Sequence, residues 1–184
     1  MKNAFHVKRK GADITWHTIC TYIIEFTVCG ICGWIYETAL TSYLWGEFAE
    51  RGFLHIPVLP IYGVFAFILL PLFRKHNGFL TVFTVSMIIT TALELASAYL
   101  IEAVLHEKLW SYSDWDFNFF GGRISLYSSL MFGVLSVILI KAVHPLVHKI
   151  SEKASSKAVC ITGSITLFII ISDFIITLYQ TIEK

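Results

Sequence analysis

Long apolar stretches dominate this sequence and limit what it can fold into. A helix needs about 20 consecutive apolar residues to cross the hydrocarbon core of a bilayer, and at least four stretches of the chain reach that length. The composition agrees, because 56% of the residues are hydrophobic and only 15% are charged. The pattern predicts an all-α integral membrane protein with a single domain over residues 1–184.

We expect a polytopic transmembrane bundle of about five helices, covering residues 14–44, 59–73, 79–105, 124–143 and 158–179. The first is longer than a bilayer requires, which indicates tilt. The second is short, and Pro60 and Pro71 bracket it. The fourth is expected to stop at Pro145, because proline inside a helix removes a backbone hydrogen bond and clashes with the preceding turn. Residues 148–157 are expected to form a solvated loop.

The positive charges are divided unevenly between the two sides of such a bundle. Cytoplasmic segments are enriched in lysine and arginine, and a cytoplasmic N-terminus puts ten of these residues inside and four outside. We therefore expect the N-terminus in the cytoplasm, the C-terminus outside it, and the chain in the cell membrane. The ten are Lys2, Lys8, Arg9, Lys10, Arg74, Lys75, Lys141, Lys149, Lys153 and Lys157.

Two polar, aromatic-rich segments interrupt the apolar pattern, Arg51–Gly63 and Trp110–Arg123. The expected orientation puts both on the extracytoplasmic side, where they predict a polar site. Arg51 and Arg123 each adjoin glycine, and a guanidinium can hold a phosphate or carboxylate through two hydrogen bonds. The alternative is that the arginines reach to the lipid interface and the aromatic rings form a belt at the headgroups. Further candidates for binding substrate are Tyr62, Tyr112 and Asn118.

Carboxylates inside the expected spans are a second indication of a site. A carboxylate at the bilayer centre costs roughly 2.5–3.5 kcal/mol on insertion scales, so it tends to face a partner or a wet cavity. Glu37 shares a helical stripe with Gly30 and Gly33, which predicts that it faces another helix. Glu94 lies near the middle of the third span. Both can be hydrogen-bonded packing groups; alternatively, either pairs with Arg51 or Arg123 to bind a zwitterionic or anionic group, or relays protons.

We expect no metal and no cofactor. His144 and His148 are four residues apart, but Pro145 lies between them and no third ligand is near in the sequence. The pair Cys29 and Cys32, inside an apolar helix, is interpreted as packing. Motifs for phosphate, dinucleotide or zinc-hydrolase chemistry are absent, so the chain does not hydrolyse ATP by itself. A net charge of +1 without a basic stripe gives no reason to expect nucleic acid as a partner.

The motifs of the central region resemble those of the CmpB-like family, a group of multi-pass membrane proteins assigned to type IV ABC transporters. They are Gly33-Trp34-x-x-Glu37, the stretch Arg51–Gly63, Trp110-x-Tyr112-Ser113, and Asn118 followed by Gly122-Arg123-Ile124. The resemblance covers roughly residues 22–145 and implies a permease component. It carries over Glu37, Arg51, Tyr62, Asn118 and Arg123 as site residues.

The chain departs from the family pattern at two positions. Ile56 stands where the family has glycine, and Ser111 stands where it has aspartate. If that aspartate is functional, Asp114 or Asp116 has to replace it.

Three functions are compatible with these features. The first is an ABC-type permease or small-solute transport component, working with a separate ATP-binding subunit or, because the expected cytoplasmic loops are short, as a homo-oligomeric carrier. The second is a membrane enzyme or binding protein that acts on a lipid or phosphate headgroup at the outer leaflet, with membrane lipids as partners. The third is a membrane subunit without a site of its own.

Overall fold

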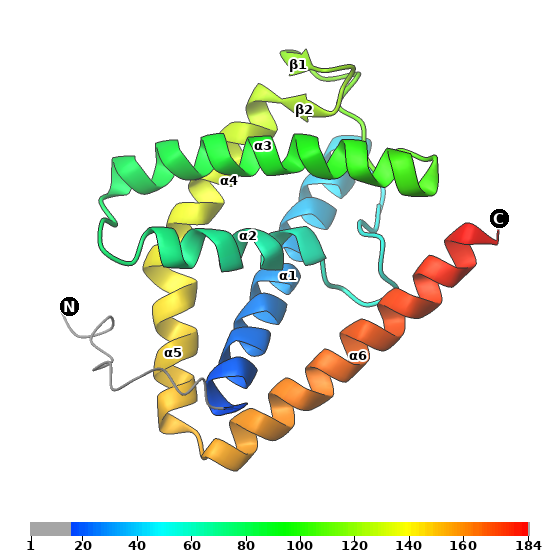
Figure 1. Cartoon of the computed structure of the whole chain (residues 1–184). Coiled ribbons are helices and arrows are strands. Elements are labelled where there is room, and N and C mark those ends of the chain that lie inside the picture. The colour runs from blue at the N-terminus through cyan, green and yellow to red at the C-terminus, as the bar shows by residue number, and fades with distance from the viewer. Residues whose placement is uncertain (1–15, 184) are drawn as a thin grey trace.

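The computed structural model describes residues 16–183 as a bundle of helices with almost no strand (Figure 1). Four helical segments within that range are long and apolar enough to cross a membrane, which confirms the predicted all-α polytopic fold. The elements are α1 (Trp16–Trp45), α2 (Pro60–Leu72), α3 (Phe79–Leu105), β1 (Asn118–Phe119), β2 (Ile124–Ser125), α4 (Leu126–Ile138), the π-helical turn η1 (Leu139–Val143), α5 (His144–Lys153) and α6 (Ser156–Ile182).

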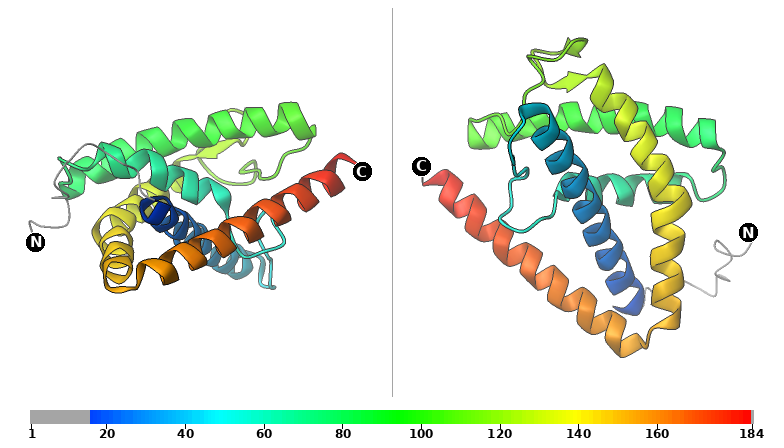
Figure 2. Two further views of the ribbon diagram at one scale, coloured as in Figure 1. Left: turned by 60° about the horizontal axis from the view of Figure 1, so that its bottom comes forward. Right: turned by 180° about the vertical axis from the view of Figure 1, so that it is seen from behind.

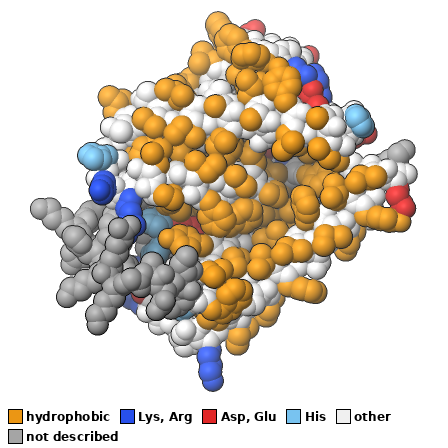
Figure 3. Space-filling view, in the orientation of Figure 1, with side chains coloured by type: hydrophobic (Ala, Val, Ile, Leu, Met, Phe, Trp, Pro, Cys, Tyr) orange, Lys and Arg blue, Asp and Glu red, His pale blue; other side chains and the backbone are white. Residues whose placement is uncertain are grey.

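Helix α1 runs through the middle of the molecule, between α6 and the continuous α4–η1–α5 segment (Figures 1 and 2). Helices α2 and α3 cross these elements at a steep angle; α2 packs on α1, and α3 packs on α4. Hydrophobic side chains cover most of the visible surface of α2, α3 and α6 (Figure 3). Such an apolar exterior is what lipid-facing helices require, because lipid tails replace water as the solvent.

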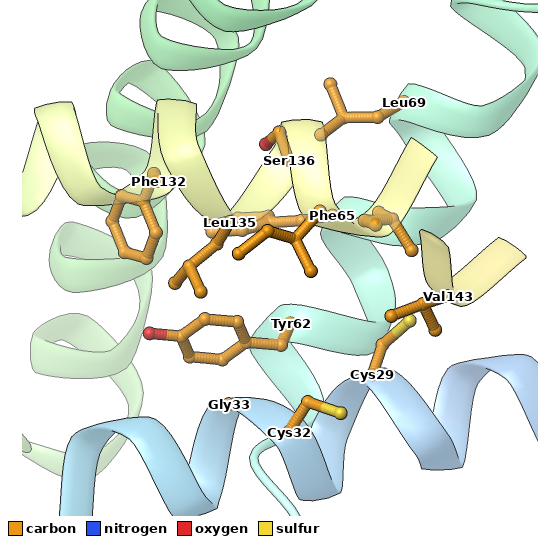
Figure 4. A pocket seen from close by; sticks show the side chains of 12 residues that line it. Cys29, Cys32, Gly33, Tyr62, Phe65, Leu69, Phe132, Leu135, Ser136 and Val143 are labelled. Atoms are coloured by element: carbon orange, nitrogen blue, oxygen red, sulfur yellow. The ribbon is translucent and has the colours of Figure 1, made fainter. Parts of the chain in front are cut away.

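The close contact between α1 and α2 depends on glycine. Tyr62 lies across Gly33 (Figure 4), and a Cβ at Gly33 would come within 2.4 Å of the Tyr62 ring. Gly63 of α2 faces Phe26 of α1 at the same 2.4 Å. At the start of α2, the Leu59 amide donates to the Gly30 carbonyl at 3.0 Å. These approaches fix the N-terminal half of α2 against α1, as small residues do at helix interfaces in membranes.

The predicted end of the fourth span at Pro145 is wrong. The helix continues through this residue to Lys153, and the turn before it is π-helical. There the His144 amide donates to the Leu139 carbonyl, five residues back. This wider turn accommodates proline, which has no amide hydrogen to donate to the helix. Residues 148–153 are consequently helical, so the predicted loop over 148–157 reduces to the short connection before α6.

The other helix boundaries lie within a few residues of the predicted ones. The start of the first span at residue 14, and Lys2, Lys8, Arg9 and Lys10, fall outside the described residues. The orientation of the chain in the membrane therefore stays a prediction. The small hairpin of β1 and β2, in which Asn118 pairs with Ser125, was not predicted.

Candidate functional site

A cavity of about 480 Å³ lies among α2, α3, α6 and the segment that precedes α2. It corresponds to the hollow between α3 and α6 in Figure 3. Most of its wall is apolar, including Phe53, Leu59, Ile61, Val64, Leu93, Leu100, Ile101, Val104, Phe132, Phe174 and Leu178. Four of the predicted site residues also line it, namely Glu37, Arg51, Glu94 and Tyr112. The two irregular segments of the sequence thus contribute to one cavity.

Glu37 of α1 is held at the cavity by Tyr62. The Tyr62 hydroxyl donates to Glu37 Oε1 at 2.9 Å, and Arg51 Nε lies 3.9 Å from Glu37 Oε2. The Arg51 amide donates to Thr38 Oγ1 at 3.3 Å, which anchors the backbone of this residue to α1. Among residues 16–183, the Arg51 guanidinium has this loose ion pair as its polar contact, so most of its donors are available to a ligand.

Glu94 of α3 is 2% exposed and lies where three elements meet. Its Oε1 accepts from the Tyr112 hydroxyl at 2.8 Å, and its Oε2 accepts from the Ser128 hydroxyl at 3.4 Å. Ser128 and Ser125 form the capping box that begins α4, so the helix start itself positions one donor. Burial and the adjacent Glu94 carboxylate raise the pKa of the Tyr112 phenol well above its usual range, which keeps it a hydrogen-bond donor.

Arg123 does not line the cavity, and of the alternative pairings the one present is Glu37 with Arg51, because Arg123 pairs with Glu102. Arg123 Nη2 lies 2.5 Å from Glu102 Oε2, at the C-terminal end of α3. Its guanidinium also lies 4.6 Å from the centre of the Tyr99 ring. The hydrogen bond to Glu102 raises the pKa of Arg123. The reason for the different partner is that the hairpin folds over the end of α3, two turns beyond Glu94.

Asn118 also lies outside the cavity lining. Its Nδ2 donates to the Trp115 carbonyl at 2.8 Å and stabilises the turn before β1. Asp114 and Asp116 are exposed in the same turn and do not line the cavity. Asn118 and Arg123 therefore hold the Trp110–Arg123 segment in place, which in turn positions Tyr112.

Sequence reasoning missed an anchor on α6. Asp173 Oδ2 accepts from the backbone amides of His55 and Ile56 at 2.9 and 3.2 Å, and Asp173 Oδ1 lies 3.0 Å from His55 Nδ1. Asp173 lies within the fifth predicted span, and nothing in the sequence indicates a contact with His55, which is 118 positions away. The contact holds the segment before α2 against α6 and closes that side of the cavity. Glu50 and Ser97, which also line the cavity, were missed as well.

The apolar helices and the polar groups that line the cavity between them define a polytopic membrane protein. The chain belongs to the family described as "Putative ABC-transporter type IV", whose model matches residues 24–178. The matched range includes every residue that lines the cavity. No curated protein and no solved structure matches the chain.

Proposed function

We propose that this protein is the membrane component of a transporter and that its cavity binds an amphipathic substrate with a zwitterionic headgroup. One observation carries the proposal: the lining of a mostly apolar cavity includes one guanidinium, that of Arg51, and three carboxylates, those of Glu37, Glu50 and Glu94. Membership of the family supports the transport role.

The apolar wall favours a substrate with a hydrocarbon part. Small-molecule sites are typically about 300–1,000 Å³, and the cavity volume of about 480 Å³ falls in that range. Each methylene group removed from water contributes about 0.8 kcal/mol. Because α3 and α6 are apolar on their outer surfaces as well, an acyl chain can enter between them without leaving the bilayer.

The charges at the polar end favour a zwitterion over a simple anion. The Arg51 guanidinium can hold a phosphate or carboxylate through two hydrogen bonds. Glu37 lies 3.9 Å from Arg51, and Glu94 is buried beside Tyr112. An ammonium group of the same substrate would face these carboxylates, whereas a ligand with negative charge alone would be repelled by them.

Energy for transport has to come from elsewhere, because the sequence lacks a nucleotide-binding motif. We propose a separate ATP-binding subunit as the partner, with a homo-oligomeric carrier as the alternative. The distribution of lysine and arginine supports placing the cavity toward the extracytoplasmic side.

Lysolipids that share one brominated acyl chain and differ in headgroup test the proposal. Bromine near Trp110, which lines the cavity, should quench its fluorescence in detergent-solubilised protein, and Trp110→Phe identifies that contribution. We expect tighter binding of the zwitterionic lysolipid than of the anionic or uncharged one. Arg51→Lys keeps the charge but loses the planar fork, so it should weaken this binding at least about tenfold.

Arg74→Lys is the matched control, since Arg74 is exposed in the turn between α2 and α3. Equal affinity for all three headgroups, or an Arg51→Lys variant that binds like the Arg74→Lys control, would contradict a headgroup site at Arg51.

A further inference from the structure

A second cluster of functional side chains lies away from the cavity, between α1 and α5. Glu25 of α1 is fully buried, and His144 and His148 face it from the α5 helix. One ligand atom from each of the three residues lies within 4.8 Å of the other two. We propose that these residues form a binding site for a divalent transition-metal ion, with zinc as the expected ion, that joins α1 to α5.

The π-helical turn lies directly before the histidine pair, and the helix continues from it through Pro145. Because His144 donates its amide to Leu139 rather than to residue 140, the helix after the turn is rotated relative to a regular α-helix, and π-turns occur often at functional sites. His144 and His148 are then one turn apart on an unbroken helix, with ring centroids 4.5 Å apart. The sequence argument against a metal was that Pro145 interrupts this helix and no third ligand is near. The continuous helix removes the first objection, and Glu25 removes the second.

Hydrogen bonds among the three residues leave some of their donor atoms unsatisfied, whereas a bound metal ion would engage them. Glu25 Oε1 lies 2.6 Å from His144 Nδ1, but Glu25 Oε2 and His148 Nε2 are buried and have no hydrogen-bond partner within residues 16–183. A buried carboxylate oxygen without a partner is costly. A divalent cation would satisfy both atoms and offset the carboxylate charge in the apolar interior.

The ligand set determines the class of ion. Two imidazoles and one carboxylate are typical zinc ligands, with bonds of about 2.0–2.2 Å and a fourth position open to water. Ligand atoms around such an ion lie roughly 3.3 Å apart, so side-chain movements of about 1 Å would close the present cluster on the metal. Magnesium and calcium prefer oxygen ligands, which this cluster supplies only through Glu25.

Zinc content tests the site independently of the transport proposal. The full chain, purified in mild detergent with a histidine-free affinity tag, is equilibrated with zinc, dialysed and measured by elemental mass spectrometry. We expect about one tightly held zinc ion per chain and a higher melting temperature with zinc than with a chelator, since a ligand that binds the folded state stabilises it.

His148→Ala is the decisive variant, because His148 is only partly buried and its replacement leaves the Glu25–His144 contact intact. We expect its zinc affinity to fall by more than the roughly 10–100-fold that follows loss of an outer-shell partner. Glu25→Gln should act in the same direction, and His76→Ala, at an exposed histidine in the α2–α3 turn, should behave like wild type. Failure of the wild-type protein to retain zinc, or equal retention by His148→Ala, would overturn the proposal, as would loss of zinc in His76→Ala.

Discussion

Replacing Gly33 with alanine should destabilise the protein and displace Glu37 at the cavity, although Gly33 does not itself line the cavity. The new Cβ would lie 2.4 Å from the Cγ and Cδ2 atoms of Tyr62, whereas carbon atoms in contact are normally about 3.5–4.0 Å apart. The Tyr62 ring would have to move by more than about 1 Å. It has little room to do so, because it is buried and packs against Phe65 and Phe132, whose ring centroids lie 6.3 and 5.8 Å away.

The expected cost has two parts. Overpacking a core costs typically about 1–3 kcal/mol, and the better helix propensity of alanine returns about 0.5–1 kcal/mol. Movement of the ring also breaks the 2.9 Å hydrogen bond from Tyr62 to Glu37, and a bond to a charged group contributes about 1.5–3 kcal/mol. We therefore expect a loss of about 2–4 kcal/mol in the free energy of unfolding, which corresponds to a melting temperature lower by roughly 5–15 °C.

Thermal unfolding in detergent, followed by the circular dichroism of the helices, measures this effect. Cys32→Ala is the matched control, since Cys32 precedes Gly33 on α1 and is exposed, and it should change stability by no more than about 0.5 kcal/mol. Because Tyr62 is the obstacle, Tyr62→Ala should remove most of the additional penalty of Gly33→Ala in the double variant. The reasoning is refuted if Gly33→Ala unfolds at the same temperature as Cys32→Ala.

Two other contacts lead to shorter predictions. Tyr112→Phe removes the donor to the buried Glu94 carboxylate and should lower the free energy of unfolding by about 1–3 kcal/mol; Tyr127→Phe, at an exposed tyrosine, should have little effect in the same melting experiment, and equal effects would contradict the role of the bond. Glu102→Gln weakens the pair with Arg123 and should speed proteolytic cleavage within residues 106–125, with unchanged cleavage as the contrary result.

The helices could be predicted from the sequence because their length is set by the bilayer. About 20 apolar residues per span leave few alternatives, and α3 was predicted to begin and end where the structure places it, at Phe79 and Leu105. Pro145 was misjudged because the argument considered only an α-helix. In a π-turn the backbone hydrogen bond joins residues five positions apart instead of four. No local sequence signal distinguishes such a turn from the end of a helix.

The cavity was predictable only in part. Irregular polar segments and carboxylates within spans indicated Glu37, Arg51, Glu94 and Tyr112, because polar groups in a membrane need polar neighbours. The partner of each arginine depends on how the loops fold back, so the contact of Arg123 with Glu102 could not be derived. The same holds for the contact of His55 with Asp173, which joins segments far apart in the sequence.

Photo-crosslinking tests the central claim, that the cavity holds an amphipathic substrate, most directly. A zwitterionic lysolipid with a photoreactive group in its acyl chain is bound to the protein, illuminated, and located by peptide mass spectrometry. We predict labels on the cavity-lining stretches of α3 and α6, around Leu100 and Phe174, and loss of these labels in Ser97→Trp, whose larger side chain would fill the cavity. Labels spread evenly over the lipid-facing surface, including Phe168, and unchanged in Ser97→Trp, would contradict the account.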